Sequence, residues 1–269
     1  MLKLLGPAFS AFTRHRSLVM QLARRDVLGR YRGATFGMLW SLISPILMLS
    51  IYTLAFGYIL KSRWPGSSGS TEDFVLILFC GLVMHGFFAE CITSAPKLIV
   101  SNANYVKKVV FPLDALVWSM VFSALFHLVM NLVVLLMLKA FLHGDIPWTA
   151  LFLPLIVLPL VVLAIGISLL VSAIGVYIRD IGQFVGVLAT ALLFLSSAIV
   201  PVQAIPDEYK WIFLSNPLTP VIDQAREVVI WGRLPDLWAL GLQTLAYLVL
   251  LVLAAHAFNK LRRGFADVL

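Results

Sequence analysis

Charged side chains are scarce in this chain of 269 residues: they make up 12% of it, whereas hydrophobic residues make up 61%. Ordinary soluble domains carry about 25% charged residues, and a water-soluble globule of this length could not hide so much apolar surface. Cysteine is also scarce, and Cys80 and Cys91 have neither metal-site nor CxxC spacing. We expect two buried free thiols in an integral membrane protein.

Signature motifs of enzymes are missing as well. The sequence has no HExxH, no GxSxG, no aspartate-rich metal motif and no cluster of His or Cys. It also lacks GxxxxGK(S/T), the loop that cradles ATP phosphates. The sequence therefore predicts no catalytic residue, no metal site and no cofactor bound by this chain. An ATP-driven process would need a second polypeptide.

Long apolar runs are abundant. A bilayer core about 30 Å thick needs roughly 20 apolar residues in a helix. We therefore predict an all-α integral membrane protein with six transmembrane helices, at residues 35–60, 74–95, 113–138, 148–177, 181–201 and 237–258. An even number of spans places both termini on one side of the membrane.

The distribution of basic residues predicts which side that is. Most of the 20 Lys and Arg residues fall in segments on the side of the termini, and most acidic residues fall on the other side. Basic residues near span ends stay cytoplasmic, so we expect both termini in the cytoplasm. The net charge of +7 then faces anionic lipid, which predicts membrane lipid as a partner and no nucleic acid.

Two segments are amphipathic without being long enough or apolar enough to span. Residues 11–31 have an apolar side and an Arg-rich side, which predicts an amphipathic interface helix within the cytoplasmic region 1–34; it could anchor to lipid, dock a partner, or do both. Residues 202–236 are predicted to lie outside and to form two short re-entrant helices. Pro206 and Pro217 suit first helical turns, and Asn216 can cap the second helix.

Polar residues inside the predicted spans are costly in lipid and need an explanation. The third span carries four, spaced four residues apart: Ser119, Ser123, His127 and Asn131. They indicate either close helix packing or a hydrated path for a hydroxyl-rich substrate. For Glu90 we expect a basic partner on the surface helix in preference to a proton-relay role. His85 and His127 are expected to be hydrogen-bonded interior residues.

Four short segments, spread from the first span to the last, match one family in its order. They read RYRGATFGMLW at residues 30–40 with Ser44-Pro45 following, NYVKKVVFP at 104–112, YIRDI at 177–181, and NPLTP at 216–220 followed by Arg226. Together they resemble the ABC-2 type permeases of polysaccharide export. Ala34 and Phe36 depart from the Ser and Leu that this family pattern has after Arg32.

The resemblance implies a channel-forming subunit in the bacterial inner membrane, with residues 35–269 as the ABC-2 type domain. Its implied partners are a second copy of itself and two copies of a P-loop ATPase, which would use ATP and Mg. The implied substrate is an undecaprenyl-linked glycan: O-antigen first, then capsule or teichoic acid polymers, with a small drug-like substrate as the runner-up. A membrane glycolipid-processing enzyme is the alternative from a different class.

The resemblance also implies roles for particular residues. The cytoplasmic segment 94–112 and the turn between spans four and five would couple to the ATPase, through Asn102, Asn104, Tyr105, Lys107, Lys108, Phe111, Arg179 and Asp180. For the two lysines a plain positive-inside anchor is the alternative. The interface helix and the start of the first span would contribute Arg24, Arg25, Arg30, Tyr31, Arg32, Gly33, Gly37 and Trp40. Segment 202–236 would be an external gate, with Pro206, Trp211, Asn216, Pro217 and Arg226.

Overall fold

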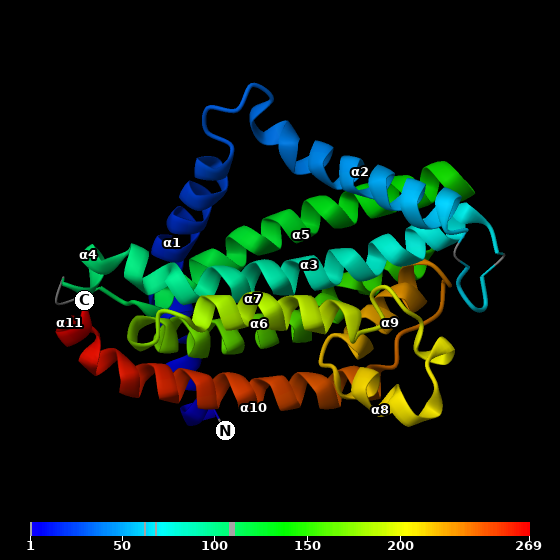
Figure 1. Ribbon diagram of the computed structural model, residues 1–269. Coiled ribbons are helices and arrows are strands. Elements are labelled where there is room, and N and C mark those ends of the chain that lie inside the picture. Colours follow the sequence, from blue (N-terminus) through cyan, green and yellow to red (C-terminus); the bar gives the residue numbers. More distant parts are fainter. Residues whose placement is uncertain (1, 62, 68, 108–110) are drawn as a thin grey trace.

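The computed structural model describes residues 2–61, 63–67, 69–107 and 111–269, with side chains from residue 12 onwards. Within those ranges every regular element is helical, and the longest helices form a bundle (Figure 1). In order they are α1 (Leu2–Arg30), η1 (Gly37–Leu39), α2 (Trp40–Tyr52), η2 (Thr53–Ile59), α3 (Thr71–Ser101), α4 (Ala103–Val106), α5 (Asp114–His143), η3 (Trp148–Phe152), α6 (Leu153–Tyr177), α7 (Ile181–Phe194), η4 (Val202–Ala204), α8 (Asp207–Ser215), α9 (Thr219–Val229), α10 (Leu237–Leu261), η5 (Arg262–Gly264) and α11 (Phe265–Val268).

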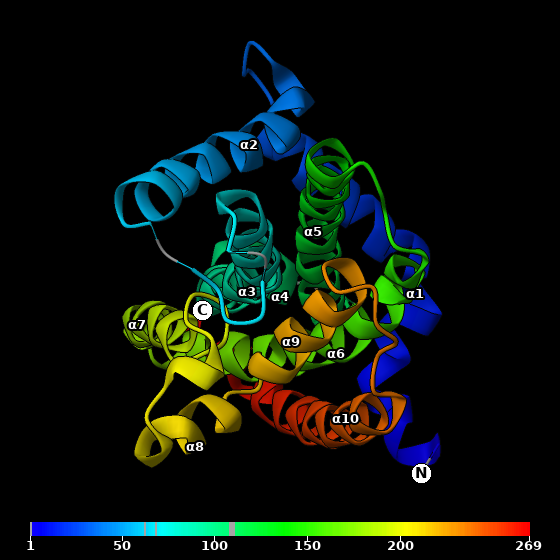
Figure 2. The same ribbon diagram turned by 90° about the vertical axis from the view of Figure 1, so that its right-hand side faces the viewer.

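Helix α3 is the centre of the bundle. It packs against α5, α6, α7 and α9 (Figure 2). Of the residues in its most apolar stretch, 78% are buried. Both cysteines lie on this helix and are buried free thiols, as expected. His85 of α3 hydrogen bonds through Nε2 to the carbonyl of Ala189 in α7, at 2.9 Å, so it is the bonded interior residue that was predicted.

Helices α3 and α6 approach each other closely at a glycine. Gly175 of α6 lies against the backbone of Pro96, where any Cβ would collide with the proline carbonyl. A residue without a side chain is what allows two backbones to approach so closely in a membrane bundle. The α3–α6 pair is therefore held at a separation that only glycine permits at this position.

The first two helices lie at the edge of the bundle. Helix α1 includes the predicted amphipathic segment, and its buried residues Val19, Leu22, Ala23 and Val27 belong to a helix that packs on α5 and α10. Most of its apolar side is therefore covered by protein, although Met20 and Leu28 stay exposed. Helix α2 leaves the end of α1 at a steep angle (Figure 1), and only 11% of the span Gly37–Ile59 is buried.

Five helical stretches within the described residues are long and apolar enough to cross a membrane: Gly37–Ile59, Thr71–Ser101, Asp114–His143, Trp148–Tyr177 and Leu237–Val268. They correspond to five of the six predicted spans. The remaining one, predicted at 181–201, is the 14-residue helix α7. At 1.5 Å per residue α7 is about 21 Å long, shorter than a bilayer core. A sixth full-length span is therefore not confirmed.

Segment 202–236 contains the two short helices that were expected, α8 and α9. Neither predicted proline lies in a first helical turn: Pro206 occupies the N-cap of α8, one residue before the helix, and Pro217 lies in the turn before α9. Pro220 occupies the first turn of α9 instead. These helices lie at one end of the bundle, whereas α4, the α6–α7 connection and the C-terminus lie at the other (Figure 1).

Candidate functional site

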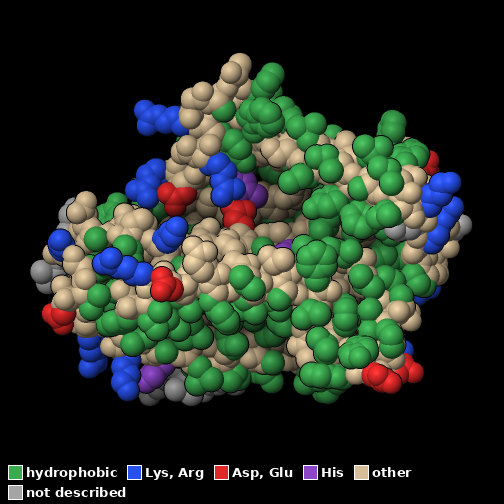
Figure 3. Space-filling model, in the orientation of Figure 1, with side chains coloured by type: hydrophobic (Ala, Val, Ile, Leu, Met, Phe, Trp, Pro, Cys, Tyr) green, Lys and Arg blue, Asp and Glu red, His purple; other side chains and the backbone are tan. Residues whose placement is uncertain are grey.

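A cavity of about 480 Å³ opens beside α3, between the end of α1, helix α2 and helix α5. Figure 3 shows a hollow on this face with basic, acidic and histidine side chains around it. The cavity is lined by Arg30, Tyr31, Trp40, Ser41, Ser44, Pro45, Met48, Tyr52, Phe79, Leu82, Val83, His85, Gly86, Glu90, His127, Asn131 and Leu193. It therefore combines ionisable groups with aromatic walls inside the apolar bundle.

The ionisable groups of the cavity form a triad. Arg30, the last residue of α1, donates from Nη2 to Oε1 of Glu90 at 2.6 Å. His127 Nδ1 lies 3.0 Å from the same carboxylate oxygen and 2.9 Å from Nη1 of Arg30. The expectation that Glu90 pairs with a basic residue of the surface helix is confirmed. The triad ties the end of α1 to α3 and α5.

The geometry at His127 allows only one of its two Nδ1 contacts at a time. Unprotonated Nδ1 accepts from Arg30, whereas protonated Nδ1 donates to Glu90. Nε2 is buried and has no hydrogen-bond partner among the described residues. A buried polar atom without a partner is a place for water or for a hydroxyl group of a ligand. The cavity therefore has polar capacity that the protein itself does not use.

The four polar residues predicted for the third span separate into two pairs. His127 and Asn131 line the cavity. Ser119 is buried and donates to the carbonyl of Leu116 on its own helix, at 2.8 Å, and Ser123 is also buried. A four-residue spacing turns by about 40° per step around an α-helix, so one face cannot hold all four. Only the second half of the predicted path faces open space.

The residues predicted at the start of the first span are also divided. Tyr31 and Trp40 line the cavity, while Arg24, Arg32 and Gly33 are exposed. Gly33 and Gly37 have φ of +85° and +48°, which favours glycine at both positions of the α1–α2 turn. This turn points α2 away from α1 and so opens the cavity between them.

At the opposite end from α8 and α9, two of the residues predicted to couple to an ATPase contact each other. Tyr105 stacks on Phe111 with ring centroids 4.3 Å apart and accepts a hydrogen bond from Nη1 of Arg25 at 3.4 Å. Asn102 donates a hydrogen bond to the carbonyl of Leu98. The other predicted coupling residues within the described ranges are exposed: Asn104, Lys107, Arg179 and Asp180. Lys108 lies outside the described residues. Arg25 thus links α1 to the α4 segment.

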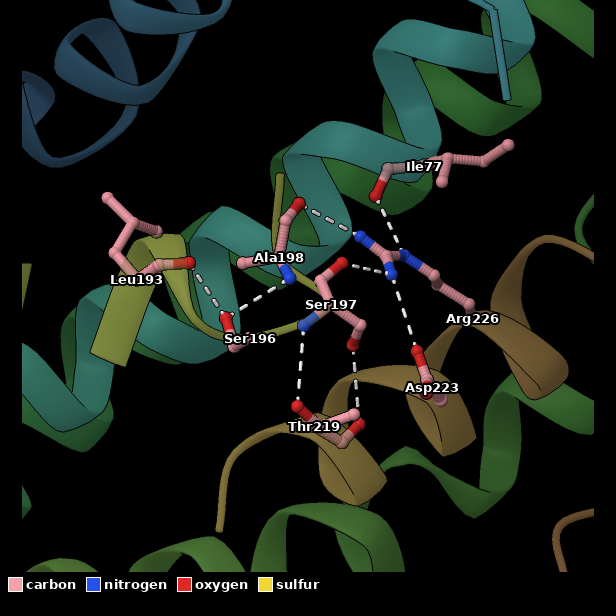
Figure 4. Close-up of polar contacts among 8 residues, drawn as sticks. All are labelled: Ile77, Leu193, Ser196, Ser197, Ala198, Thr219, Asp223 and Arg226. Carbon is pink, nitrogen blue, oxygen red and sulfur yellow. Dashed lines mark hydrogen bonds and ion pairs between the residues drawn. The ribbon is translucent and has the colours of Figure 1, made fainter. Parts of the chain in front are cut away.

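At the α8–α9 end, Arg226 is the most highly connected polar side chain. It is 3% exposed and donates to the carbonyls of Ile77 at 3.0 Å, Ser197 at 2.6 Å and Ala198 at 3.0 Å (Figure 4). It also lies 3.4 Å from a carboxylate oxygen of Asp223, one turn earlier in α9. One guanidinium group therefore joins α3, the turn after α7, and α9.

Two further groups complete this cluster. The guanidinium of Arg226 lies over the indole of Trp64 at 4.3 Å from the ring centre, a cation–π contact with the loop after the first span. Burial raises the pKa of the Asp223 carboxyl above its ordinary value, while hydrogen bonds from Ser197 and Arg226 oppose that rise. The carboxylate nevertheless balances the buried positive charge of Arg226.

Asn216 has a different role from the predicted one. Its amide donates to the carbonyls of Leu192 and Leu195, both at 3.0 Å, and so satisfies the free end of α7. Its oxygen accepts from the amide of Leu218, before α9 begins, and α9 has no side-chain cap. Asn216 therefore caps the end of α7 rather than the start of α9. Trp211, also predicted for this region, is exposed on α8.

Sequence reasoning missed the partners of Arg226 and the histidine partner of Glu90 in different ways. Asp223 precedes Arg226 by one helical turn, a spacing that signals a local ion pair. The other partners of Arg226 are the backbone carbonyls of Ile77, Ser197 and Ala198. They could not be predicted from the sequence, because every residue has a backbone carbonyl. His127 was noted as a polar residue of the third span, but its contact with Glu90, 37 residues away, has no local signal.

Comparison with known proteins adds evidence from the whole chain. A family model described as ABC-2 type transporter matches residues 17–230. The O-antigen export system permease protein RfbA of Klebsiella pneumoniae is 26% identical over 254 residues, which cover 94% of this chain and 95% of that protein. RfbA of Myxococcus xanthus is 27% identical, with the same coverage. The polysialic acid transport protein KpsM of Escherichia coli is 27% identical, covering 85% of this chain and 87% of KpsM.

Proposed function

The chain belongs to the ABC-2 type transporter family, and on that premise we propose that it is the transmembrane subunit of an exporter of lipid-linked polysaccharide, with O-antigen as the first candidate substrate. The observation that carries the proposal is similarity along nearly the full length of both chains to permeases of O-antigen export. Similarity to the polysialic acid transport protein KpsM and to the capsule polysaccharide export protein CtrC of Neisseria meningitidis makes a capsule polymer the second candidate.

The proposed location is the bacterial inner membrane, with both termini cytoplasmic. The unequal distribution of Lys and Arg supports this orientation. It puts α4 and the exposed turn at Arg179 and Asp180 on the cytoplasmic side, where two copies of a separate P-loop ATPase would dock. The contact between Arg25 and Tyr105 would carry movement of that docking surface to α1.

The proposed path of the glycan includes the cavity beside α3. Sugar hydroxyls need donors and acceptors in place of water, and His127, Asn131 and Glu90 offer them among aromatic walls. The span Gly37–Ile59 exposes most of its surface, which supports assembly with a second copy around a shared channel. Helices α8 and α9, fixed by Arg226, would form the external gate of that channel.

The test of the coupling surface is the variant Lys107→Glu, made in the tagged chain co-expressed with a candidate P-loop ATPase from the same genome. Lys107 is exposed at the end of α4, so reversing its charge should leave the fold intact. We expect ATPase copurification and ATPase activity of the complex to fall several-fold. Lys61→Glu is the matched control, since Lys61 is also exposed but follows the first span at the opposite end of the bundle from α4.

Two results would count against the proposed function. One is a wild-type chain that binds no ATPase. The other is a deletion strain that still displays its surface polysaccharide. Together these would favour the membrane glycolipid-processing enzyme, which would work without an ATPase. If ATPase binding holds but polysaccharide display is unaffected, a small drug-like substrate or another polymer, such as teichoic acid, becomes the better candidate.

The triad gives a second prediction, on stability. Glu90→Gln removes the charge that Arg30 and His127 share, and we expect a loss of about 1–2 kcal/mol because Arg30 is half exposed and solvent screens part of the pair. Arg30→Gln alone should lower the free energy of unfolding by less than Glu90→Gln does. In a double-mutant cycle by thermal unfolding in detergent, coupling between the two positions is the expected outcome, and simple additivity would show that the contact contributes nothing.

A further inference from the structure

A second pocket lies at the α8–α9 end, above the buried Arg226, and it is separate from the cavity beside α3. Its volume is about 250 Å³, and its lining comes from the loop at Trp64–Gly66, the segment Pro201–Gln203, helix α9 and the turn that follows α9. Pockets for drug-sized ligands measure about 300–1,000 Å³, so this one suits a single small ring. We propose that this pocket binds one neutral sugar ring.

Charge balance is the first argument for a neutral ligand. The pocket holds two arginines and two carboxylates, and each arginine already has a carboxylate close by. Arg226 lies 3.4 Å from Asp223, and Arg233 lies 3.6 Å from Glu227. An anion such as phosphate would find no uncompensated positive charge here, and a cation would find no spare negative charge. A neutral ring with hydroxyl groups needs no uncompensated charge of either sign.

Hydrogen-bonding capacity is the second argument. Arg226 uses four of its five N–H groups on three carbonyls and Asp223, which leaves one N–H without a partner in the part of the chain that the structure describes. Gln203 is exposed at the pocket, and its amide makes no hydrogen bond within the described residues. The carboxylates of Asp223 and Glu227 keep acceptor sites beyond their arginine contacts. Planar amide, carboxylate and guanidinium groups can each bond two neighbouring hydroxyls of a sugar.

An aromatic wall is the third argument. Trp231, half-buried in the turn just after α9, lines the same pocket. An indole next to planar polar groups offers an apolar surface for the C–H face of a pyranose, while the polar groups bond its hydroxyls. The assignment of a sugar to this pocket rests on the proposed function. At the outer end of an exporter, the pocket would hold one sugar unit of the polymer as the polymer leaves.

The test is direct binding by the purified full chain in lipid nanodiscs, without any ATPase. The probes are the methyl glycosides of mannose, galactose, rhamnose and N-acetylglucosamine, titrated by saturation-transfer difference NMR, with sodium glucuronate and inorganic phosphate as charged probes. We expect at least one methyl glycoside to bind with a millimolar Kd. Glu227→Gln and Gln203→Ala should each raise that Kd at least fivefold.

The control variant is Glu208→Gln, which makes the same chemical change at an exposed position of α8 outside the pocket; its Kd should equal that of wild type. Both test positions retain solvent exposure, and elution as a single species on size exclusion checks that the variants fold. Three results would each overturn the proposal: no methyl glycoside binds, neither pocket variant weakens binding, or a charged probe binds tenfold tighter. Failure here would leave ATPase coupling, read through Lys107→Glu, untouched.

Discussion

Replacing Arg226 by methionine should remove most of the folded protein. The substitution keeps an apolar stem but leaves three buried carbonyls and the Asp223 carboxylate without the group that bonds them. Removing one partner of a buried charge pair costs about 3–5 kcal/mol, and the unpaired carbonyls add to this. We expect a sharp fall in monodisperse protein on size exclusion and a large drop in Tm.

Two comparison variants separate the causes. Arg226→Lys keeps the positive charge but lacks the planar fork that reaches three carbonyls, so its Tm should lie between those of wild type and Arg226→Met. Arg233→Met alters an arginine of the same region whose side chain is 71% exposed, and should change stability by less than about 0.5 kcal/mol. Equal effects of Arg226→Met and Arg233→Met would contradict the role assigned to Arg226.

Gly175→Ala should lower the stability of the protein by an amount comparable to that of Arg226→Met, through packing alone. The added Cβ would fall on the backbone carbonyl of Pro96, and backbone cannot rotate away as a side chain can. Overpacking of this kind costs about 1–3 kcal/mol, occasionally more, and α3 and α6 form one of the most extensive pairs in the bundle. We therefore expect a loss at or above the upper end of that range, measured as Tm in the same detergent.

Gly186→Ala is the matched control for this prediction. Gly186 also lies within a helix, α7, but its Cβ would meet no other atom within 4 Å. Alanine favours a helix interior by about 1 kcal/mol over glycine, so this variant should be as stable as wild type or slightly more stable. If Gly175→Ala unfolds at the wild-type temperature, the helices are not held at the separation described here.

The sequence was informative wherever the cause of a structure is local. Apolar runs are contiguous, so five spans could be placed with starts within three residues of the observed ones, although three of them extend five to ten residues further than predicted. Glu90 could be assigned a basic partner because a carboxylate in a span needs one, and α1 was the nearest Arg-rich element. The family resemblance at four segments is confirmed by the family match over residues 17–230.

The sequence was less informative where residues far apart along the chain determine the structure. Helix α7 ends at Phe194 although the apolar run continues, and the amide of Asn216, 24 residues after Leu192, bonds its last turn. The spacing of Ser119 to Asn131 indicated a spiral, but only the positions of α2 and α3 decide which half of it faces a cavity. The roles proposed for the coupling and gate residues stay predictions.

The central position of α3 also bears on how the chain enters the membrane. A carboxylate in the middle of a lone helix opposes insertion by about 2–3 kcal/mol, and α3 carries Glu90 together with His85. Arg30 precedes α3 along the chain, so its partner is already at the membrane surface when Glu90 leaves the ribosome, while His127 arrives one helix later. The order of synthesis thus supplies the counter-charge before the helix that needs it.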